Sequence, residues 1–189
     1  SIGDPIKRFE EDPVRCLRAI RFSNKLKFKI DNQIKDAIYK KGHLLKDISN
    51  ARMFDEFCKL FMNGFAYPNF KKINTFSLDQ VFIEQYKNTI WQKICIESMK
   101  NTDNRLNNGK TANPGFLLAA IMWPYLLSHC IDKNKINLKK FFRNMDKVIK
   151  NQQKRTAIPR KFFSYIKDIW FLQLKLHSRI KNHPYKTLK

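Results

Sequence analysis

The sequence has 189 residues, of which 43% are hydrophobic and 13% aromatic. This composition excludes a disordered chain and allows one substantial core or two small ones. With 38 Lys and Arg residues against 16 Asp and Glu residues, the formal net charge is +22, which indicates a polyanionic partner and favours RNA or DNA over a membrane surface.

The first predicted helix begins at Asp12 and Pro13 and ends near Leu26. Asp12 is a good N-cap, and proline is favoured at the first helical position. Arginines recur every three residues along one side of this helix: Arg15, Arg18 and Arg21. Because Asp12 lies one turn before Arg15, a carboxylate and a guanidinium can share one surface.

This pair of side chains has two interpretations. A carboxylate beside a planar fork of five donors can hydrogen-bond the edge of a nucleobase, and neighbouring arginines can hold phosphates. Alternatively, Asp12 only caps the helix, Arg15 only pairs with it, and the other arginines form a solvated face. Chemistry alone favours the second interpretation, because caps are far commoner than base-reading sites.

Three further helices are predicted before residue 77. Asp31 is the candidate N-cap of the first, and Ser49 caps the second, residues 51–63, which Gly64 ends. The core side of the second helix follows the three-and-four spacing of Phe54, Phe57, Cys58 and Phe61. Arg52 and Glu56 lie four residues apart on it, which predicts a surface ion pair. The third helix covers residues 69–76.

We place a domain boundary at residues 77–83. After it, a helix is predicted from about residue 84 to residue 107, and Asn113 with Pro114 begins an apolar helix that we expect at the centre of a second core. A basic helix follows from residue 134, and a last helix covers residues 159–181. We expect cations of this region to contact a phosphate backbone, namely Lys139, Lys140, Arg143, Arg160 and Lys161.

The cysteines and histidines form no pattern typical of a metal site or a disulfide framework. The four Cys residues are far apart and include no CxxC pair, so we interpret them as reduced thiols of a cytoplasmic protein. The apolar run at residues 115–127 is too short to span a bilayer, and Pro124 within it favours a kinked, buried helix. Ser1 is not a Met and no signal segment follows it, so we interpret the sequence as beginning inside a longer protein.

The stretch EDPVRCLRAIRF, residues 11–22, resembles the EDxxR motif of class II nucleotidyltransferases, the family of bacterial poly(A) polymerases and CCA-adding enzymes. In this family the Asp and Arg of the motif hydrogen-bond the base of the incoming nucleotide. The matching positions are Asp12 and Arg15, and we expect Arg8 and Arg18 to support them. This resemblance favours a nucleotide-binding site over a simple helix cap with a solvated arginine face, in contrast to the chemistry taken alone.

The remaining chain also resembles this family. Residues 30–64 are similar to its neck, which helps to hold the nucleotide pocket and the RNA, so Arg52 is expected to brace the neck helices. Arg21 and Arg52 are candidates for RNA contact. Residues 100–127 and 157–176 resemble segments of poly(A) polymerases that CCA-adding enzymes lack in this form. The resemblance is expected to end near residues 183–184, where poly(A) polymerases continue into an arginine-rich tail.

The resemblance implies an all-α fold with a helical neck, residues 1–76, and a helical body with a truncated basic RNA-binding end, residues 77–189. It implies an enzyme that adds AMP from ATP to RNA 3′ ends, and an RNA helicase of the decay machinery as a partner. The family's chemistry needs Mg²⁺ held by carboxylates of a head domain. This sequence has no strand-borne DxD pair and no Gly-rich phosphate loop, so we expect base selection and RNA holding from it, without catalytic or metal-binding residues.

Two alternatives remain open at this point. A CCA-adding tRNA nucleotidyltransferase would share the motif but accept CTP as well as ATP. A non-catalytic basic helical module would bind RNA without any nucleotide dependence, and its EDxxR match would be only a capped helix.

Overall fold

Helices make up nearly all of the regular structure in the computed structural model, which describes residues 3–82, 89–132 and 135–182. In chain order the helices are α1 (Pro5–Glu11), α2 (Val14–Lys25), α3 (Asn32–Lys41), the 3₁₀ helix η1 (Gly42–Asp47), α4 (Asn50–Phe61), α5 (Ala66–Thr75), the 3₁₀ helix η2 (Asp79–Val81), α6 (Thr89–Asn107), α7 (Pro114–Ser128), α8 (Leu138–Gln153) and α9 (Lys161–Asn182). Within the described residues, strands are confined to an antiparallel pair of two-residue segments, β1 (Ile131–Asp132) and β2 (Lys135–Ile136). The predicted all-α fold is therefore confirmed, and this short ladder is an addition to it.

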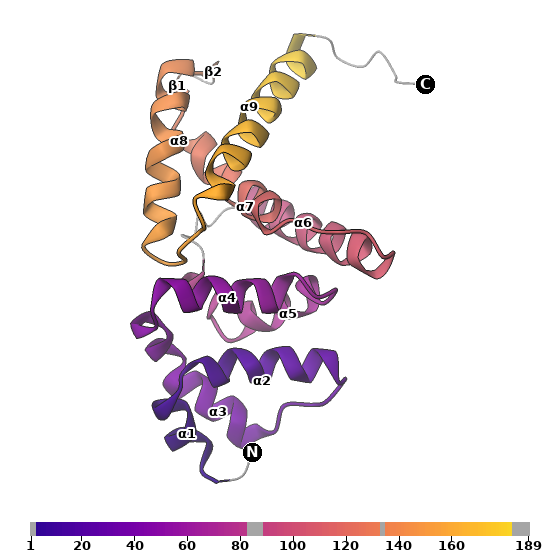
Figure 1. Cartoon of the computed structure of the whole chain (residues 1–189), viewed down its shortest axis with the longest axis vertical. Coiled ribbons are helices and arrows are strands. Elements are labelled where there is room, and N and C mark those ends of the chain that lie inside the picture. Colours follow the sequence, from indigo (N-terminus) through magenta and orange to yellow (C-terminus); the bar gives the residue numbers. More distant parts are fainter. Residues whose placement is uncertain (1–2, 83–88, 133–134, 183–189) are drawn as a thin grey trace.

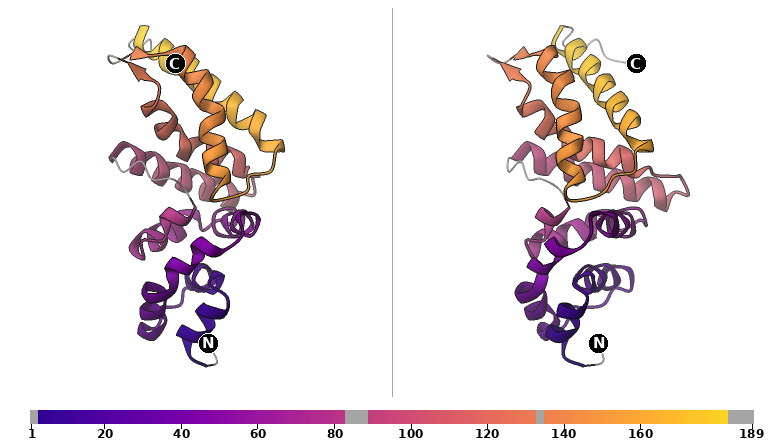
Figure 2. Two further views of the ribbon diagram at one scale, coloured as in Figure 1. Left: turned by 90° about the vertical axis from the view of Figure 1, so that its left-hand side faces the viewer. Right: turned by 60° about the vertical axis from the view of Figure 1, so that its left-hand side comes forward.

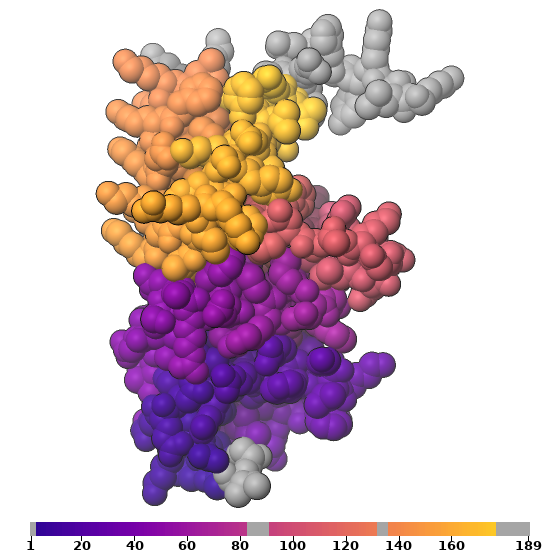
Figure 3. Space-filling model, in the orientation of Figure 1, coloured from indigo at the N-terminus to yellow at the C-terminus, as the bar shows by residue number. Residues whose placement is uncertain are grey.

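The helices are arranged along one long axis. Helices α1 to α5 occupy one end and α6 to α9 the other, with α4 and α5 in the middle (Figure 1). The two rotated views keep this order (Figure 2). Helix α5 packs against both α2 and α6, and α7 packs against α6, α8 and α9. In the space-filling view, α6 projects to one side of the column formed by α8 and α9 (Figure 3).

Short polar side chains begin several helices as predicted. Asp31 caps α3 by accepting a hydrogen bond from the backbone N–H of Gln33 (2.9 Å), and Ser49 caps α4 through the N–H of Arg52 (3.4 Å). Asn113 caps α7 through the N–H of Gly115 (2.8 Å). Such bonds satisfy donors that the first turn of a helix leaves unpaired.

Helix α7 lies at the centre of the second half, as its apolar sequence predicts. Two tryptophans of other helices donate to its backbone: Trp170 to the carbonyl of Ala119 (2.9 Å) and Trp91 to that of Ile121 (3.1 Å). The helix continues through Pro124 to Ser128, so the proline does not end it. No helix among the described residues has the length and apolar character needed to cross a membrane.

The buried face of α4 differs from the expected one. Phe57 and Phe61 are buried as predicted, but Met53, Glu56 and Leu60 complete the buried face. Phe54 is only half-buried, and its ring lies 6.2 Å from that of Phe162 of α9. The buried face of α4 is thus rotated about the helix axis relative to the predicted one, and it packs against both α2 and α5.

The predicted boundary at residues 77–83 lies partly outside the described residues, as does the predicted start of α6 near residue 84, and the division into two domains stays a prediction. Phe82 is buried and its ring lies 6.2 Å from that of Phe57 and 5.9 Å from that of Phe61. Aromatic packing therefore continues across most of the proposed boundary.

Candidate nucleotide and RNA site

Asp12 lies at the junction of α1 and α2. Helix α1, which begins at the Asp4 cap and runs to Glu11, was not expected from the sequence, and Asp12 is its C-cap. Pro13 is the N-cap of α2, and no side chain caps that helix. The prediction that Asp12 caps the motif helix is therefore wrong, because Asp12 lies one residue too early and its extended backbone (φ −146°, ψ 92°) directs its carboxylate elsewhere.

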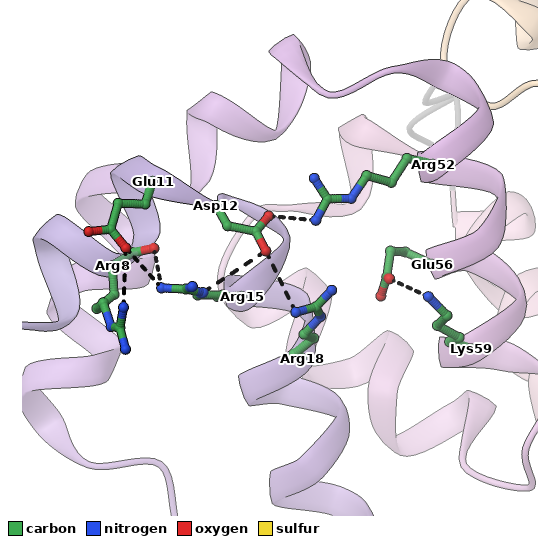
Figure 4. Close-up of polar contacts among 8 residues, drawn as sticks. All are labelled: Arg8, Glu11, Asp12, Arg15, Arg18, Arg52, Glu56 and Lys59. Atoms are coloured by element: carbon green, nitrogen blue, oxygen red, sulfur yellow. Dashed lines mark hydrogen bonds and ion pairs between the residues drawn. The ribbon is translucent and has the colours of Figure 1, made fainter. Parts of the chain in front are cut away.

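The Asp12 carboxylate faces three arginines (Figure 4). Its Oδ1 accepts a hydrogen bond from Nη2 of Arg52 at 2.7 Å. Its Oδ2 lies 3.6 Å from Nη1 of Arg18 and 4.0 Å from Nε of Arg15. We call these four residues, Asp12, Arg15, Arg18 and Arg52, the Asp12 cluster.

Arg15 is held mainly by the end of α1 and only loosely by Asp12. Its Nη1 donates to Oε2 of Glu11 and to the carbonyl of Arg8, each at 3.2 Å. Glu11 also binds Nη1 of Arg8 at 3.3 Å. A cation at this position is favourable, because the last carbonyls of a helix are unpaired and carry partial negative charge. These contacts fix the orientation of the Arg15 guanidinium.

Arg52 does not form the predicted surface pair with Glu56. Glu56 is only 1% exposed, and its Oε1 accepts a hydrogen bond from Lys59 at 2.8 Å. Arg52 instead reaches from α4 to Asp12, because α4 packs on α2 and presents its first turn to the α1–α2 junction. This contact connects α4 with the α1–α2 junction. A bracing role of Arg52 and its contact with RNA both stay predictions.

The Asp12 cluster has the groups needed to recognise a nucleotide. Three guanidinium groups against one carboxylate leave excess positive charge, and each guanidinium has five N–H donors. The Asp12 side chain is 18% exposed, and those of Arg15, Arg18 and Arg52 are 34%, 40% and 42% exposed. The cluster is thus partly open to a ligand, with an acceptor beside several donors.

The other predicted cations are not part of the Asp12 cluster. Lys139, Lys140 and Arg143 are in the first turns of α8, which begins beside β2 at the end of the molecule opposite α1 (Figure 1). Arg160 and Lys161 are exposed at the start of α9. Arg21 is on α2, where its guanidinium lies 4.8 Å from the centroid of the Phe22 ring and its Nε is buried without a hydrogen-bond partner.

The cysteines are free thiols, as expected. Burial raises the pKa of the Cys16 thiol to about 12 and that of Cys58 to about 11. Such thiols are poor nucleophiles at neutral pH. Across the described residues, no three His, Cys, Asp or Glu side chains come together in a group that could hold a metal ion.

The sequence did not predict the structural role of the Asp103 carboxylate. Asp103 of α6 accepts hydrogen bonds from the backbone N–H groups of Ala66 (2.6 Å) and Tyr67 (2.9 Å), and so caps α5 from another helix. Burial raises the pKa of Asp103, although both hydrogen bonds act in the opposite direction. Local capping patterns do not predict a cap that comes from a residue so distant in the chain.

Two family models match the sequence. One, described as the probable RNA and SrmB-binding site of polymerase A, matches residues 27–89, and the other, described as the polymerase A arginine-rich C-terminus, matches residues 134–189. The second match reaches the last residue. The expectation that the resemblance ends near residues 183–184 is therefore wrong.

Similar proteins distinguish between the two enzyme types. Poly(A) polymerase I of Salmonella typhimurium is 32% identical over 199 residues, covering 100% of this chain and 43% of that protein. Poly(A) polymerase I of Haemophilus influenzae is 32% identical over 200 residues, covering 100% of this chain and 44% of that protein. A CCA-adding enzyme of Anoxybacillus flavithermus is 43% identical over 66 residues, which is 35% of this chain and 17% of that enzyme.

This chain thus spans less than half the length of the poly(A) polymerases that it matches. Its similarity to them covers its whole length, whereas the similarity to the CCA-adding enzyme covers about a third. The regions named by both family models are present in it. From these findings we conclude that the chain belongs to the poly(A) polymerase I family.

Proposed function

We propose that this chain is the nucleotide-selecting and RNA-holding part of a polynucleotide adenylyltransferase, which adds AMP from ATP to RNA 3′ ends. The observation that carries the proposal is the Asp12 cluster, formed by an EDxxR motif in a member of the poly(A) polymerase I family. In this proposal Asp12 and Arg15 hydrogen-bond adenine. Arg8 and Arg18 support the site, and Arg52 holds Asp12 from α4.

The chemistry of adenine supports these roles. Adenine presents an amino donor beside a ring-nitrogen acceptor. A carboxylate accepts from the first, and an arginine donates to the second. Guanine presents an oxygen acceptor in place of the amino group, so the carboxylate would meet another acceptor. Cytosine also has an amino donor next to a ring nitrogen and can offer the same two groups. Discrimination between ATP and CTP must therefore depend on where the base lies relative to Asp12 and Arg15.

The metal centre in this proposal lies outside the present sequence. Transfer of AMP would use Mg²⁺ as a Lewis acid that stabilises the negative charge developing on the phosphates of ATP. The relatives are more than twice as long as this chain, and we propose that the carboxylates which hold the metal belong to residues outside it. The present residues then select the base and hold the RNA strand.

RNA binding fits the charge of the chain. The net charge is +22, and the model that matches residues 27–89 names RNA and SrmB in its description. We propose that RNA contacts this region and the cations Arg21, Lys139, Lys140, Arg143, Arg160 and Lys161. We extend the proposal to SrmB as a protein partner, to the helicase of the decay machinery that the resemblance implies, and to a cytoplasmic location.

The test is nucleotide incorporation by the polypeptide of the complete reading frame that contains this chain. With an RNA primer and labelled ATP or CTP, we expect a long tail of AMP alone. Arg15→Ala should lose the preference for ATP or the activity itself. Lys7→Ala is the matched control, because it removes an exposed cation from α1 outside the cluster. An unchanged nucleotide profile in Arg15→Ala would refute the assignment, and CTP addition to a tRNA that lacks its end would favour the CCA-adding alternative.

A further inference from the structure

A cavity of about 650 Å³ opens in the body, away from the Asp12 cluster. It lies between the C-terminal half of α6, the segment 111–113, the first turn of α7 and the first turns of α9. Its lining includes Asn101, Arg105, Asn113, Phe116, Phe162 and Tyr165. Figures 1 and 3 show this region where the projecting α6 meets the base of the α9 column. We call it the α6–α9 cavity.

A glycine allows aromatic rings to form one wall of this cavity. A Cβ atom on Gly115 would lie 3.0 Å from Cδ1 of Phe162 and 3.1 Å from Cδ1 of Tyr165. Both rings therefore approach the first turn of α7 more closely than a larger residue would allow. Phe116 and Tyr165 remain 47% and 39% exposed. The cavity thus presents two aromatic side chains that the core does not cover.

The orientation of Arg105 beside these rings is fixed. Its Nε and Nη2 both donate to the carbonyl of Thr111, at 3.2 Å and 3.1 Å. Two of the five guanidinium N–H groups are used in this way, so donors remain for a ligand. Lys161 adds a second cation near this wall, with Nζ 5.2 Å from the centroid of the Phe162 ring. The lining residues include no carboxylate.

We propose that the α6–α9 cavity is a subsite for one nucleotide of a single-stranded RNA, with its base stacked on Phe116 or Tyr165 and Arg105 bound to the adjacent phosphate. Exposed aromatic rings beside cations are typical of proteins that bind single strands, because every base offers a π-face for stacking. The volume is sufficient for a nucleotide. The subsite rests on the proposed function only in taking RNA as the ligand, and it lies outside residues 27–89 of the RNA-binding match.

A nucleotide of an RNA strand fits this cavity better than free ATP. A triphosphate carries several negative charges, whereas Arg105 is the cation of the lining and Lys161 lies at its margin. A single phosphate between two sugars needs only one such partner. The rest of the strand can then be attracted by the net charge of +22.

The test compares binding of the 189-residue chain to single-stranded oligo(A) and to an abasic strand of the same length, by fluorescence anisotropy. We expect oligo(A) to bind more tightly, and we expect Phe116→Leu with Tyr165→Leu to reduce this preference roughly tenfold. Leucine keeps the apolar bulk and removes the aromatic face, and far-UV circular dichroism checks that the variant folds. Phe142→Leu is the matched control, because Phe142 is 49% exposed on α8, outside the cavity.

The other outcomes of this experiment distinguish failure of the subsite from failure of RNA binding and from failure of the proposed function. A double variant that keeps the full preference for oligo(A) overturns the subsite but leaves RNA binding intact. Loss of ATP binding in the same variant, measured by calorimetry without RNA, assigns the cavity to a free nucleotide and also overturns the strand proposal. Failure of the wild-type chain to bind either strand overturns both the subsite and the RNA-holding role. If the polypeptide of the complete reading frame adds no AMP while the 189-residue chain shows the expected base preference, the proposed function alone is overturned.

Discussion

The two ends of the molecule use their positive charges differently. In the neck, Arg15, Arg18 and Arg52 surround one carboxylate, and helices distant in the sequence supply them. On α8 and just before α9, Lys139, Arg143 and Arg160 are exposed, and Lys167 of α9 forms an ion pair with Asp146 of α8 at 2.5 Å. The neck therefore has directed, partly buried guanidinium groups, whereas the body has a diffuse positive surface.

This difference determines what each end can recognise. An arginine fixed by several acceptors presents its remaining donors in one direction, which suits a base edge or a bound phosphate. A solvated lysine attracts any polyanion, and salt screens the attraction. In the proposed function, the Asp12 cluster would therefore select the base and the basic helices would hold the RNA strand. The predictions below test this contrast, beginning with the largest expected effect.

Phe57→Ala tests whether the two ends form one cooperative unit. Phe57 is fully buried, and its ring lies 4.9 Å from that of Phe61 and 6.2 Å from that of Phe82. The cavity left behind should lower the free energy of unfolding by about 3 to 5 kcal/mol. Urea unfolding followed by circular dichroism measures this loss, with exposed Phe142→Ala as the control.

All three tryptophans follow residue 90, and of their ring contacts among the described residues only that of Trp91 with Phe70, at a centroid distance of 6.3 Å, reaches the neck, so their fluorescence reports mainly on the body. We expect the fluorescence and circular dichroism transitions of Phe57→Ala to shift together. A body transition that stays in place while part of the dichroism signal is lost earlier would show that the neck unfolds separately.

Asp12→Ala tests the charge balance of the neck. Without the carboxylate, three guanidinium groups repel one another, and we expect a loss of about 1 to 2 kcal/mol, a value lowered for the partial exposure of the cluster. Urea unfolding at low and high salt is the measurement, and the loss should shrink at high salt. Asp146→Ala is the control, because the Asp146 side chain is 73% exposed, and its stability should hardly change. Equal losses in both variants would contradict the contrast.

Lys139→Gln with Arg143→Gln tests the diffuse surface of the body. If both side chains meet phosphates, the log-log salt dependence of binding to single-stranded RNA should become less steep by about 1.4, or about 0.7 for each contact. Titrations at several salt concentrations provide the slope. The matched variant is Lys100→Gln with Lys167→Gln, which removes as many charges from lysines that pair with Glu97 and Asp146. A similar change of slope in both variants would show that RNA binding depends on the number of cations and not on their positions.

Alkaline pH should reveal the thiols of Cys16, which is buried, and Cys58, which is half-buried. Burial raises the pKa values of Cys16 and Cys58 to about 12 and about 11, from an ordinary value of 9.0. Because the folded values exceed the unfolded one, this contribution to stability is complete below pH 9 and is lost as the pH rises toward 11 and 12. The stability of the wild type relative to Cys16→Ala with Cys58→Ala should therefore fall above pH 9 in urea titrations. A constant difference would contradict burial of these thiols in the folded state.

Much of the fold follows from local sequence patterns. Asp31, Ser49 and Asn113 cap helices at the predicted places, because a cap bond joins residues only two or three positions apart. The continuous apolar residues of α7 predict its central position, since such a helix must be covered on all sides. Errors arise where α1 directly precedes α2. There the capping pattern is present, but the backbone of Asp12 belongs to the end of the preceding helix.

The candidate site likewise combines features that the sequence predicts with features that depend on tertiary packing. By itself the sequence determined that the chain is helical, basic and similar to the poly(A) polymerase family, and that Asp12 and Arg15 belong to the matching motif. Only the tertiary structure decided that Arg52 binds Asp12 across 40 positions, that Glu56 is buried, and that the α6–α9 cavity exists. The physical reason is that helix formation depends on neighbours within one or two turns, whereas these contacts depend on how the completed helices pack.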